Sequence, residues 1–331
     1  MTPPVSIGAI GLGGWGRGMV EKIRETPSLR LVGCCDVDAG RASALGQTWN
    51  CAATSSVEEL LAMSGLEAVA IFTPNSRHRE GVEAAAAAGK HVFVEKPIAV
   101  TTEDGRAMIA ACERAGVTLM VGHNMRRHSP YRRLKALLEA EEAGQVVMVE
   151  GHTGHAGGLS VTADQWRWLR AECPGGPLMQ LGVHHLDTYQ YLLGPARAAL
   201  AAFGKTVTAS EIEDATLSIV EMSSGVLCYL GTNYVAPYVR MLNVYGTRAN
   251  LLATGESLQI QRPEGVEEVA LEPVDAMREE VEEFARCIRQ GVPPETGGPE
   301  GLAALAMVRA CLTAAETGCR TPVEDTRRLT R

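Results

Sequence analysis

The stretch Gly11–Gly16 constrains the fold more strongly than any other part of the chain. Its sequence, Gly-Leu-Gly-Gly-Trp-Gly, matches the pattern G-x-G-x-x-G and lies between an apolar run at 5–10 and a helical pattern at 15–25. In this context the first glycine permits a tight turn, the second lets the backbone approach a pyrophosphate, and the third lets helix and strand pack closely. The alternative is a purely structural glycine turn. The residues predicted to bind a dinucleotide here are Gly11, Gly13, Gly14, Trp15 and Gly16.

An acidic residue follows at the distance expected for a ribose contact. Asp36 ends the second apolar run, 20 residues beyond Gly16, where a carboxylate can accept hydrogen bonds from the adenosine ribose. That carboxylate would repel a 2′-phosphate, and Asp38 adds a second negative charge. Arg41 could reduce the repulsion. The sequence therefore predicts NAD as the cofactor rather than NADP, with Asp36 and Arg41 beside the ribose.

Short apolar runs alternate with helical patterns through the first third of the chain. The runs lie at 5–10, 29–35, 68–72, 91–94 and 117–121. Strands that alternate regularly with helices form parallel sheets with helices on both faces. We therefore predict that residues 1–124 form a doubly wound α/β domain.

Residues 125–331 follow a different pattern. Strand-like runs succeed one another between 199 and 271 without intervening helices, and helical patterns precede and follow them. This order predicts an α+β domain whose mostly antiparallel sheet is backed by helices. One face of that sheet would lack a helical cover, and an exposed apolar face normally binds a partner. We therefore expect a homodimer or homotetramer.

Composition and charge exclude several classes of partner. The chain has 331 residues and a net charge of −8, which provides no basic surface for nucleic acid. No apolar run approaches the roughly 18–20 residues that span a bilayer, and the amino terminus lacks the pattern of a signal peptide. The nine cysteines include no C-x-x-C pair. These features predict a cytoplasmic protein that binds neither nucleic acid nor membrane.

Two tripeptides follow apolar strands of the predicted parallel sheet. Thr73-Pro74-Asn75 comes after the run at 68–72, and Glu95-Lys96-Pro97 comes after the run at 91–94. Ligands of doubly wound sheets bind at the carboxyl ends of the strands, so both tripeptides are expected near the cofactor. Lys96 is either a solvated loop residue or a desolvated functional amine.

The helical pattern at 178–193 carries candidate acid–base groups. On an α-helix Gln180, His184 and Asp187 share one face, because they are separated by four and three residues. Histidine changes charge near neutral pH, which suits the transfer of an alcohol proton. The alternative is that His184 and His185 are polar residues at a domain interface. Although His152 and His155 lie upstream, no nearby Cys or acid completes a known metal pattern, and we expect no metal site.

Taken together, these motifs resemble the Gfo/Idh/MocA oxidoreductases. The resemblance rests on the glycine stretch, the two tripeptides, the segment 175–187 (GGPLMQLGVHHLD), and the carboxyl-terminal stretches at 284–291 and 301–305. It covers the whole chain in the same order. It implies a Rossmann domain followed by a domain with an open-faced, mostly antiparallel sheet. It also implies oxidation or reduction of sugars, cyclitols or related polyols with NAD(P).

The resemblance assigns roles to individual residues. Lys96 matches the lysine that hydrogen-bonds the reacting oxygen beside the nicotinamide, and His184 matches the general acid/base. Further positions match residues that line the ribose and nicotinamide or contact the substrate, and these are Thr73, Asn75, His78, Asn124 and Arg127. Trp166 could form a wall against which a sugar stacks, or it could simply anchor its loop.

Gln180 departs from the family pattern, because many members have aspartate four residues before the histidine. A glutamine can orient a hydroxyl but cannot take a proton or balance an imidazolium. We expect Gln180 to bind the substrate, while Asp187 could supply the missing carboxylate. The predicted function is NAD-dependent hydride transfer between nicotinamide and a secondary alcohol or ketone of a sugar- or cyclitol-like substrate. The alternatives are a cofactor-binding sensor without turnover and a non-redox lyase or glycosidase that uses NAD transiently.

Overall fold

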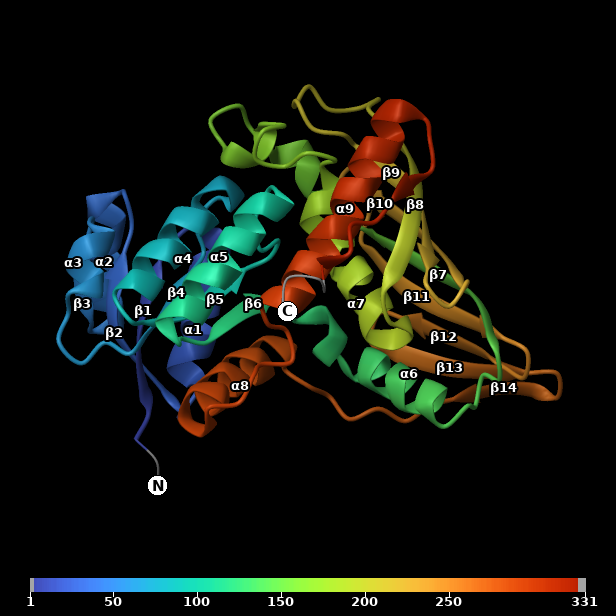
Figure 1. Ribbon diagram of the computed structural model, residues 1–331, viewed down its shortest axis with the longest axis horizontal. Coiled ribbons are helices and arrows are strands. Elements are labelled where there is room, and N and C mark those ends of the chain that lie inside the picture. The colour runs from blue at the N-terminus through green and yellow to red at the C-terminus, as the bar shows by residue number, and fades with distance from the viewer. Residues whose placement is uncertain (1–2, 327–331) are drawn as a thin grey trace. The chain divides into compact units, whose positions relative to one another are not determined.

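The computed structural model describes residues 3–326 and divides them into two compact units (Figure 1). The first unit contains the chain up to His123 together with Asp275–Leu302, and the second contains Asn124–Val274 and the chain from Ala303 onward. Met1 and Thr2, part of the segment expected to lack a signal peptide, lie outside the described residues. Within the described part, no helix has both the length and the apolar character that a bilayer span requires.

The first unit contains a six-stranded parallel sheet, which confirms the predicted doubly wound fold. Its strand order is β3-β2-β1-β4-β5-β6. The strands are β1 (Val5–Ile10), β2 (Leu29–Cys35), β3 (Ala52–Thr54), β4 (Ala68–Ile71), β5 (His91–Glu95) and β6 (Leu119–Gly122). The helices between them are α1 (Gly14–Glu25), α2 (Ala39–Trp49), α3 (Val57–Leu61), α4 (His78–Ala87) and α5 (Thr102–Ala115). In this order the strand sequence reverses between β1 and β4, which is where doubly wound sheets bind their ligands.

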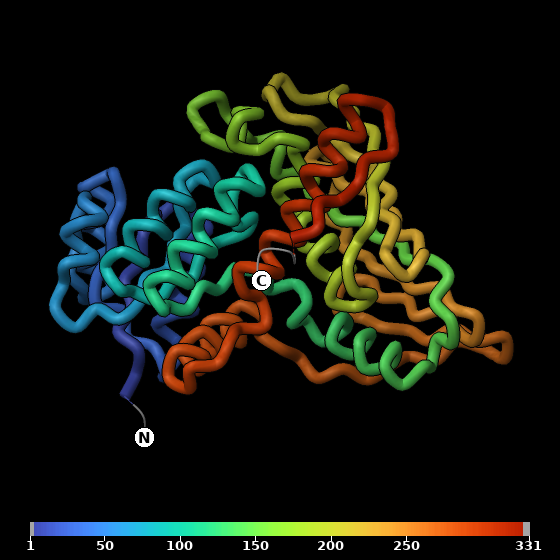
Figure 2. Tube along the Cα trace, in the orientation of Figure 1, coloured from blue at the N-terminus to red at the C-terminus, as the bar shows by residue number. Residues whose placement is uncertain are grey.

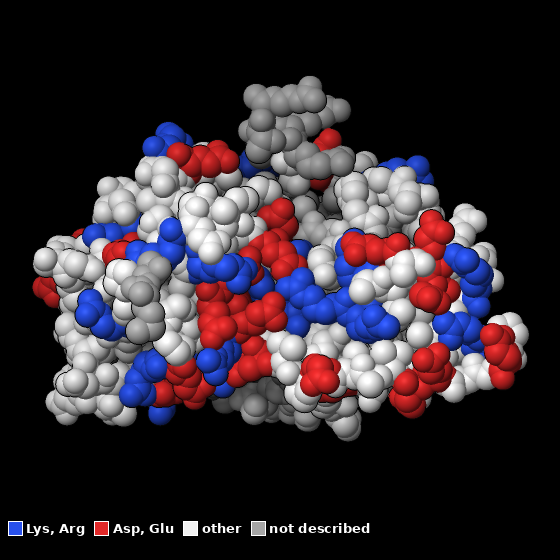
Figure 3. Space-filling model, turned by 90° about the horizontal axis from the view of Figure 1, so that it is seen from below, with Lys and Arg blue, Asp and Glu red and all other residues white. Residues whose placement is uncertain are grey.

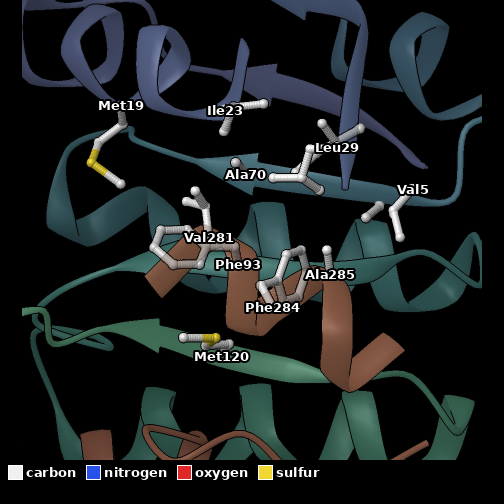
Figure 4. Close-up of a cluster of buried hydrophobic side chains, with 12 residues drawn as sticks. Val5, Met19, Ile23, Leu29, Ala70, Phe93, Met120, Val281, Phe284 and Ala285 are labelled. Carbon is white, nitrogen blue, oxygen red and sulfur yellow. The ribbon is translucent and has the colours of Figure 1, made fainter. Parts of the chain in front are cut away.

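A helix from the carboxyl-terminal part of the sequence completes the first unit. The chain leaves this unit after β6 and returns through α8 (Ala276–Gln290), as Figure 2 shows. The rings of Phe284 and Phe93 pack edge to face, with 5.9 Å between their centres. They belong to a core that also contains Val5, Met120 and Val281 (Figure 4). The structure therefore differs from the single division predicted at residue 124. The physical reason is that the apolar face of α8 is buried against the parallel sheet.

The second unit contains a nine-stranded sheet of order β14-β13-β12-β11-β7-β10-β9-β8-β15. Only the β7–β10 pair is parallel among its described strand pairs, which confirms the predicted, mostly antiparallel sheet. The strands are β7 (Val146–Gly154), β8 (Ala196–Gly204), β9 (Ala215–Met222), β10 (Leu227–Asn233), β11 (Val239–Gly246), β12 (Asn250–Thr254), β13 (Ser257–Arg262), β14 (Gly265–Glu268) and β15 (Thr321–Pro322).

Helices of the second unit cover one face of this sheet. They are α6 (Ser129–Glu139), α7 (Val183–Leu193) and most of α9 (Gly298–Thr317). The hydroxyl of Tyr189 on α7 donates to the carbonyl oxygen of Tyr229 on β10 over 2.7 Å. Alternate residues of β9 point to the opposite face, where Leu217 is 64% exposed and Ile219 47% exposed. Within residues 3–326 no helix of the second unit covers this face of the sheet, as expected (Figure 1).

Charged side chains of both signs are interspersed on the face drawn in Figure 3. Ion pairs at the protein surface include Arg278 with Glu282 on α8 at 2.8 Å and Arg262 with Glu142 at 3.0 Å. Pairs of this kind contribute little to stability. The face drawn in Figure 3 carries mixed charge rather than a uniform basic surface.

Candidate active site

Two glycines of the predicted pyrophosphate loop are required by the fold itself. Gly11 has a φ of +89°, and a Cβ atom there would lie 2.8 Å from the carbonyl carbon of Phe72. A Cβ on Gly16 would lie 2.1 Å from the carbonyl oxygen of Gly11. Gly11 therefore permits the tight turn and lets the loop approach the end of β4. Gly16 allows α1 to pack closely on β1.

No contact within the protein requires glycine at the other two positions, Gly13 and Gly14. A Cβ on Gly13 or Gly14 would meet no atom within 4 Å. Gly13 caps α1 without a side chain, and the first turn of α1 carries no acidic residue. The amino-terminal N–H groups of a helix attract anions when no side chain caps them. The open space and the uncapped helix end together fit a pyrophosphate.

Asp36 lies where the sequence predicted, beside the glycine loop. Its Oδ2 accepts a hydrogen bond from the backbone N–H of Leu12 at 2.7 Å, and its Oδ1 accepts one from the N–H of Asp38 at 2.9 Å. The guanidinium of Arg41 donates to Oδ1 at 3.0 Å and also lies 3.3 Å from Asp38. Asp36 thus links the end of β2 to the glycine loop. Arg41 forms an ion pair with this carboxylate, which is the group predicted to bind the ribose.

His78 is buried beneath the two tripeptide loops. Its ring Nδ1 lies 3.0 Å from the carbonyl oxygen of Pro97, and its Nε2 lies 3.2 Å from that of Thr73. Asn75, also buried, begins the short 3₁₀ turn that leads into α4. The structure places His78 as a link between the loop after β4 and the loop after β5. The role expected from the family resemblance, lining the cofactor, stays a prediction.

Glu95 ends β5 and binds groups on two sides. Its Oε1 accepts from the indole Nε1 of Trp15 at 2.6 Å, and its Oε2 accepts from the backbone N–H of Lys96 at 3.1 Å. A Cβ on Gly122 would lie 3.2 Å from the Glu95 carboxyl carbon, so the glycine leaves room for this group. The Lys96–Pro97 peptide bond is cis, and the side chain of Lys96 is half-buried.

The second unit carries the predicted acid–base residues. The segment expected to be one α-helix begins with a π-helical turn, η5 (Leu178–Gly182), and becomes α-helical at Val183. The prediction of one continuous α-helix is therefore wrong over Leu178–Gly182, while a shared face for Gln180 and His184 stays a prediction. Gln180 is buried, and its Nε2 donates to the sulfur of Cys173 at 2.7 Å.

Asp187 forms a buried ion pair that the sequence did not indicate. Its Oδ2 accepts from Nε of Arg126 at 2.8 Å, and its Oδ1 accepts from a terminal nitrogen of the same guanidinium at 2.6 Å. This bidentate pair joins α7 to the 3₁₀ turn η2 (Met125–Arg127), which follows Asn124 and carries the buried Arg127. The pair gives Asp187 a structural role, and its predicted role as the carboxylate that serves His184 stays a prediction.

Trp166 lies in a 3₁₀ turn, η4 (Trp166–Trp168), within the long loop after β7. It packs on a small core formed by Cys173, Ile212 and Tyr234. The guanidinium of Arg167 lies 4.2 Å from the centre of its ring. These contacts favour a role as an anchor of the loop, and a stacking contact with a sugar stays a prediction.

The first unit thus brings together most of the predicted cofactor residues, namely Gly11, Gly13, Gly14, Trp15, Gly16, Asp36, Arg41, Thr73, Asn75 and Glu95 with Lys96. His184 belongs to the second unit, so its approach to Lys96 stays a prediction. Across residues 3–326 the structure shows no group of three His, Cys, Asp or Glu side chains that could hold a metal ion.

Comparison with known proteins connects these features to a family. Residues 5–123 match the model of an oxidoreductase family with an NAD-binding Rossmann fold, and residues 131–252 match the model of the GFO/IDH/MocA C-terminal domain. The matched segments coincide with the parallel sheet and with the first part of the mixed sheet.

Individual proteins are similar along most of the chain. The 1,5-anhydro-D-fructose reductase of Ensifer adhaerens is 30% identical over 82% of this chain and 84% of its own. The D-apiose dehydrogenase of Paraburkholderia graminis is 29% identical over 93% and 87%. A crystal structure of a proposed NADPH-dependent oxidoreductase from Desulfitobacterium hafniense superimposes with a TM-score of 0.94, at 33% identity over 98% and 99% of the two chains. With both domain models matched in order, the chain belongs to the Gfo/Idh/MocA family of oxidoreductases.

Proposed function

We propose that this protein transfers a hydride between a nicotinamide dinucleotide and a secondary alcohol or ketone of a sugar- or cyclitol-like substrate. The observation that carries the proposal is the glycine loop. Gly13 and Gly14 leave open space over the uncapped end of α1, beside Asp36, and the lysine-bearing tripeptide ends β5 in the same unit. The named relatives that reduce or oxidise sugars support the same substrate class.

The residues of the chain divide the chemistry between them. The bound nicotinamide would accept or supply the hydride, which is the cofactor's own chemistry. Lys96 would donate a hydrogen bond to the substrate oxygen, so that negative charge developing there is stabilised. His184 would take the hydroxyl proton during oxidation and return it during reduction. Asn124, Arg127 and Gln180 remain proposed contacts to nicotinamide or substrate.

We propose NAD as the preferred cofactor. The Asp36 carboxylate can bind a ribose diol but repels a 2′-phosphate, and Asp38 adds to that repulsion. Arg41 lies against both carboxylates, at 3.0 Å from Asp36 and 3.3 Å from Asp38. Its charge offers a partner for a 2′-phosphate, so weaker binding of NADP is compatible with this site.

A sensor without turnover is the second candidate, and Gln180 is the observation that favours it. Its amide donates to the sulfur of Cys173, and glutamine cannot stabilise a charged histidine as a carboxylate does. A family member that binds cofactor and ligand but lacks efficient proton transfer would act by binding alone.

One experiment separates these functions. The protein is incubated with NAD or NADP and a panel of sugars and cyclitols, while nicotinamide absorbance and product formation are followed. Accumulation of reduced cofactor establishes the dehydrogenase. A new product without net reduction would instead indicate the lyase or glycosidase that uses NAD transiently. Thermal stabilisation by a ligand without any product would indicate the sensor.

We also propose that the protein is a homo-oligomer assembled through the open face of the nine-stranded sheet. Leu217, Ile219 and Leu227 are large apolar side chains exposed on this face. Contiguous exposed apolar surface of this kind is typical of an interface between subunits. A cytoplasmic location, favoured by the odd number of cysteines, stays a prediction.

A further inference from the structure

A hydrogen bond joins the glycine loop to the far side of the cofactor site. The indole Nε1 of Trp15, the second residue of α1, donates to Oε1 of Glu95, the last residue of β5, over 2.6 Å. In the sheet β4 lies between β1 and β5. Because neighbouring strands are about 4.8 Å apart, the tryptophan side chain reaches across the carboxyl end of β4 to make this bond.

The partner of Trp15 is a carboxylate whose place is closely defined. Glu95 is only 6% exposed, and a buried carboxylate is costly unless hydrogen bonds compensate for its lost hydration. One oxygen accepts from Trp15 and the other from the N–H of Lys96, while Gly122 leaves room beneath the group. Glu95 therefore fixes two things together, the orientation of the indole and the start of the loop that carries Lys96.

Trp15 keeps much of its ring at the surface despite this bond. Its exposed fraction is 44%, so the fold gains little from burying it. A dinucleotide bound to a sheet of this order crosses the point between β1 and β4, with its adenosine half towards β2 and its other half towards β5. The exposed indole lies on the β4–β5 side because Glu95 holds it there.

We propose that Trp15 forms a wall of the subsite for the nicotinamide nucleotide, and that Glu95 is the positioning residue that holds the indole in place. The inference rests on the proposed function, since it requires a dinucleotide over the glycine loop. An aromatic face there provides apolar contact area at little cost in conformational entropy. The Glu95 carboxylate then holds both the indole of Trp15 and the backbone N–H of Lys96 in place.

The test compares two ligands, one that contains the nicotinamide and one that lacks it. Trp15→Phe keeps an aromatic ring but removes the N–H donor, and calorimetry measures the Kd of NADH and of ADP-ribose, which lacks nicotinamide. We expect Trp15→Phe to weaken NADH by up to about tenfold, because binding must then order a ring that Glu95 no longer holds in place. ADP-ribose should bind as it does to the wild type. If the wild type prefers NADPH, then NADPH and 2′-phospho-ADP-ribose replace the pair.

Trp49 provides a matched control in the same unit. Its indole Nε1 also donates to a carboxylate, Oε1 of Glu21, over 2.7 Å, but Trp49 ends α2 and is buried. Trp49→Phe removes a comparable hydrogen bond outside the site and should leave both Kd values unchanged. NADH should also quench less tryptophan emission in Trp15→Phe than in Trp49→Phe, because Trp15 lies closer to the nicotinamide.

A second variant tests the role of Glu95. In Glu95→Gln the single amide oxygen can face either Trp15 or the N–H of Lys96, but not both. NADH should therefore weaken while ADP-ribose does not, and kcat should fall as well. Equal weakening of both ligands, or unchanged NADH binding in Trp15→Phe, would overturn the inference but leave the proposed function intact. A wild type that binds neither NADH nor NADPH would overturn both.

Discussion

The imidazole Nδ1 of His78 lies 3.0 Å from the carbonyl oxygen of Pro97, and through its other nitrogen the same ring reaches Thr73. One buried side chain thus holds together the two loops that follow β4 and β5. Lys96 lies in the second of these loops, directly before Pro97. The position of its amine therefore depends on a residue on α4 that sequence reasoning placed beside the cofactor.

We predict that His78→Leu lowers kcat/KM by about 10- to 100-fold, because small displacements of a catalytic group have effects of that size. It should also reduce the free energy of unfolding by about 1–3 kcal/mol, since buried carbonyl groups lose a partner. His91→Leu is the control. His91 begins β5 at its other end, where its Nδ1 accepts from the N–H of Thr118 at 3.0 Å. If both variants lose stability but only His78→Leu loses activity, the positioning role holds.

Cofactor choice is tested at Asp36. Asp36→Asn keeps an acceptor for a ribose hydroxyl but removes the charge that repels a 2′-phosphate. We expect NAD to weaken by about tenfold, typical of losing a hydrogen bond to a charged group, while NADP weakens less or binds better. The measurement is the Kd of each cofactor. Equal weakening of both would show that Asp36 serves the loop, through its bond to the N–H of Leu12, and not the ribose.

The next prediction concerns the effect of the side chain at position 180 on the pKa of His184, on the proposal that both residues contact the substrate. A carboxylate in place of the amide favours the charged imidazolium and so raises the histidine pKa. During oxidation the neutral imidazole is the base. The acidic limb of the kcat/KM profile should therefore move to higher pH in Gln180→Asp.

The outcomes at Gln180 also distinguish the candidate functions. In a dehydrogenase, Gln180→Ala should mainly raise KM because a substrate contact is lost, and Cys173→Ala, which removes the sulfur that Gln180 contacts, is the control for local packing. In a sensor, Gln180→Asp could create slow turnover where the wild type has none. A pH profile that does not move in Gln180→Asp would contradict an interaction between the two residues.

Local patterns in the sequence predicted the regular part of this fold. The alternation of apolar runs and helices identified five of the six parallel strands, and the glycine pattern located the loop after β1. The short strand β3 (Ala52–Thr54) was missed because three residues at a sheet edge show no periodicity. The return of α8 was missed for another reason. An amphipathic pattern shows that a helix has a buried face, but it does not show which sheet covers that face.

In the candidate site, too, residues with a local sequence signal were predicted and residues without one were missed. Asp36 was found because a known spacing links it to the glycine loop, whereas the Arg126–Asp187 pair joins residues 61 positions apart with no local signal. Arginine and aspartate are also usually exposed, so their burial is not expected from sequence. The π-helical turn η5, which contains Gln180, was missed because five residues are too few to distinguish its period from that of an α-helix.

Glu150 is expected to make stability depend on acid pH. Burial raises its pKa, but hydrogen bonds from the hydroxyls of Tyr229 and Tyr245 and from the amide of Asn243 outweigh that effect, and the pKa falls below its ordinary value. A carboxylate with a lowered pKa stabilises the fold above the pKa of the unfolded chain. That contribution disappears as pH falls through the folded-state pKa.

The measurement is urea unfolding at several pH values, for the wild type and for Glu150→Gln. The difference in free energy of unfolding should be under about 1 kcal/mol at neutral pH, because solvent screens a partly exposed carboxylate, and should shrink below pH about 4, near the ordinary pKa of a glutamate. Tyr245→Phe, which keeps the charge but removes one donor, should reduce the same pH dependence. A difference that is constant with pH would rule out this role for Glu150.

The open face of the nine-stranded sheet gives the final prediction, which concerns assembly. Leu217 and Ile219 point outward from β9 and are 64% and 47% exposed, so an interface on this face would bury both. Two lysines there would have to be desolvated in the interface, which is costly, whereas burying two aliphatic side chains is favourable. Leu217→Lys/Ile219→Lys should therefore convert the oligomer to monomers in light scattering while each subunit stays folded. Val37→Lys is the matched control, because Val37 is 96% exposed and belongs to the first unit, which does not contain this sheet. A wild type that scatters as a monomer, or a double variant that keeps its oligomeric mass, would show that this face is not the interface.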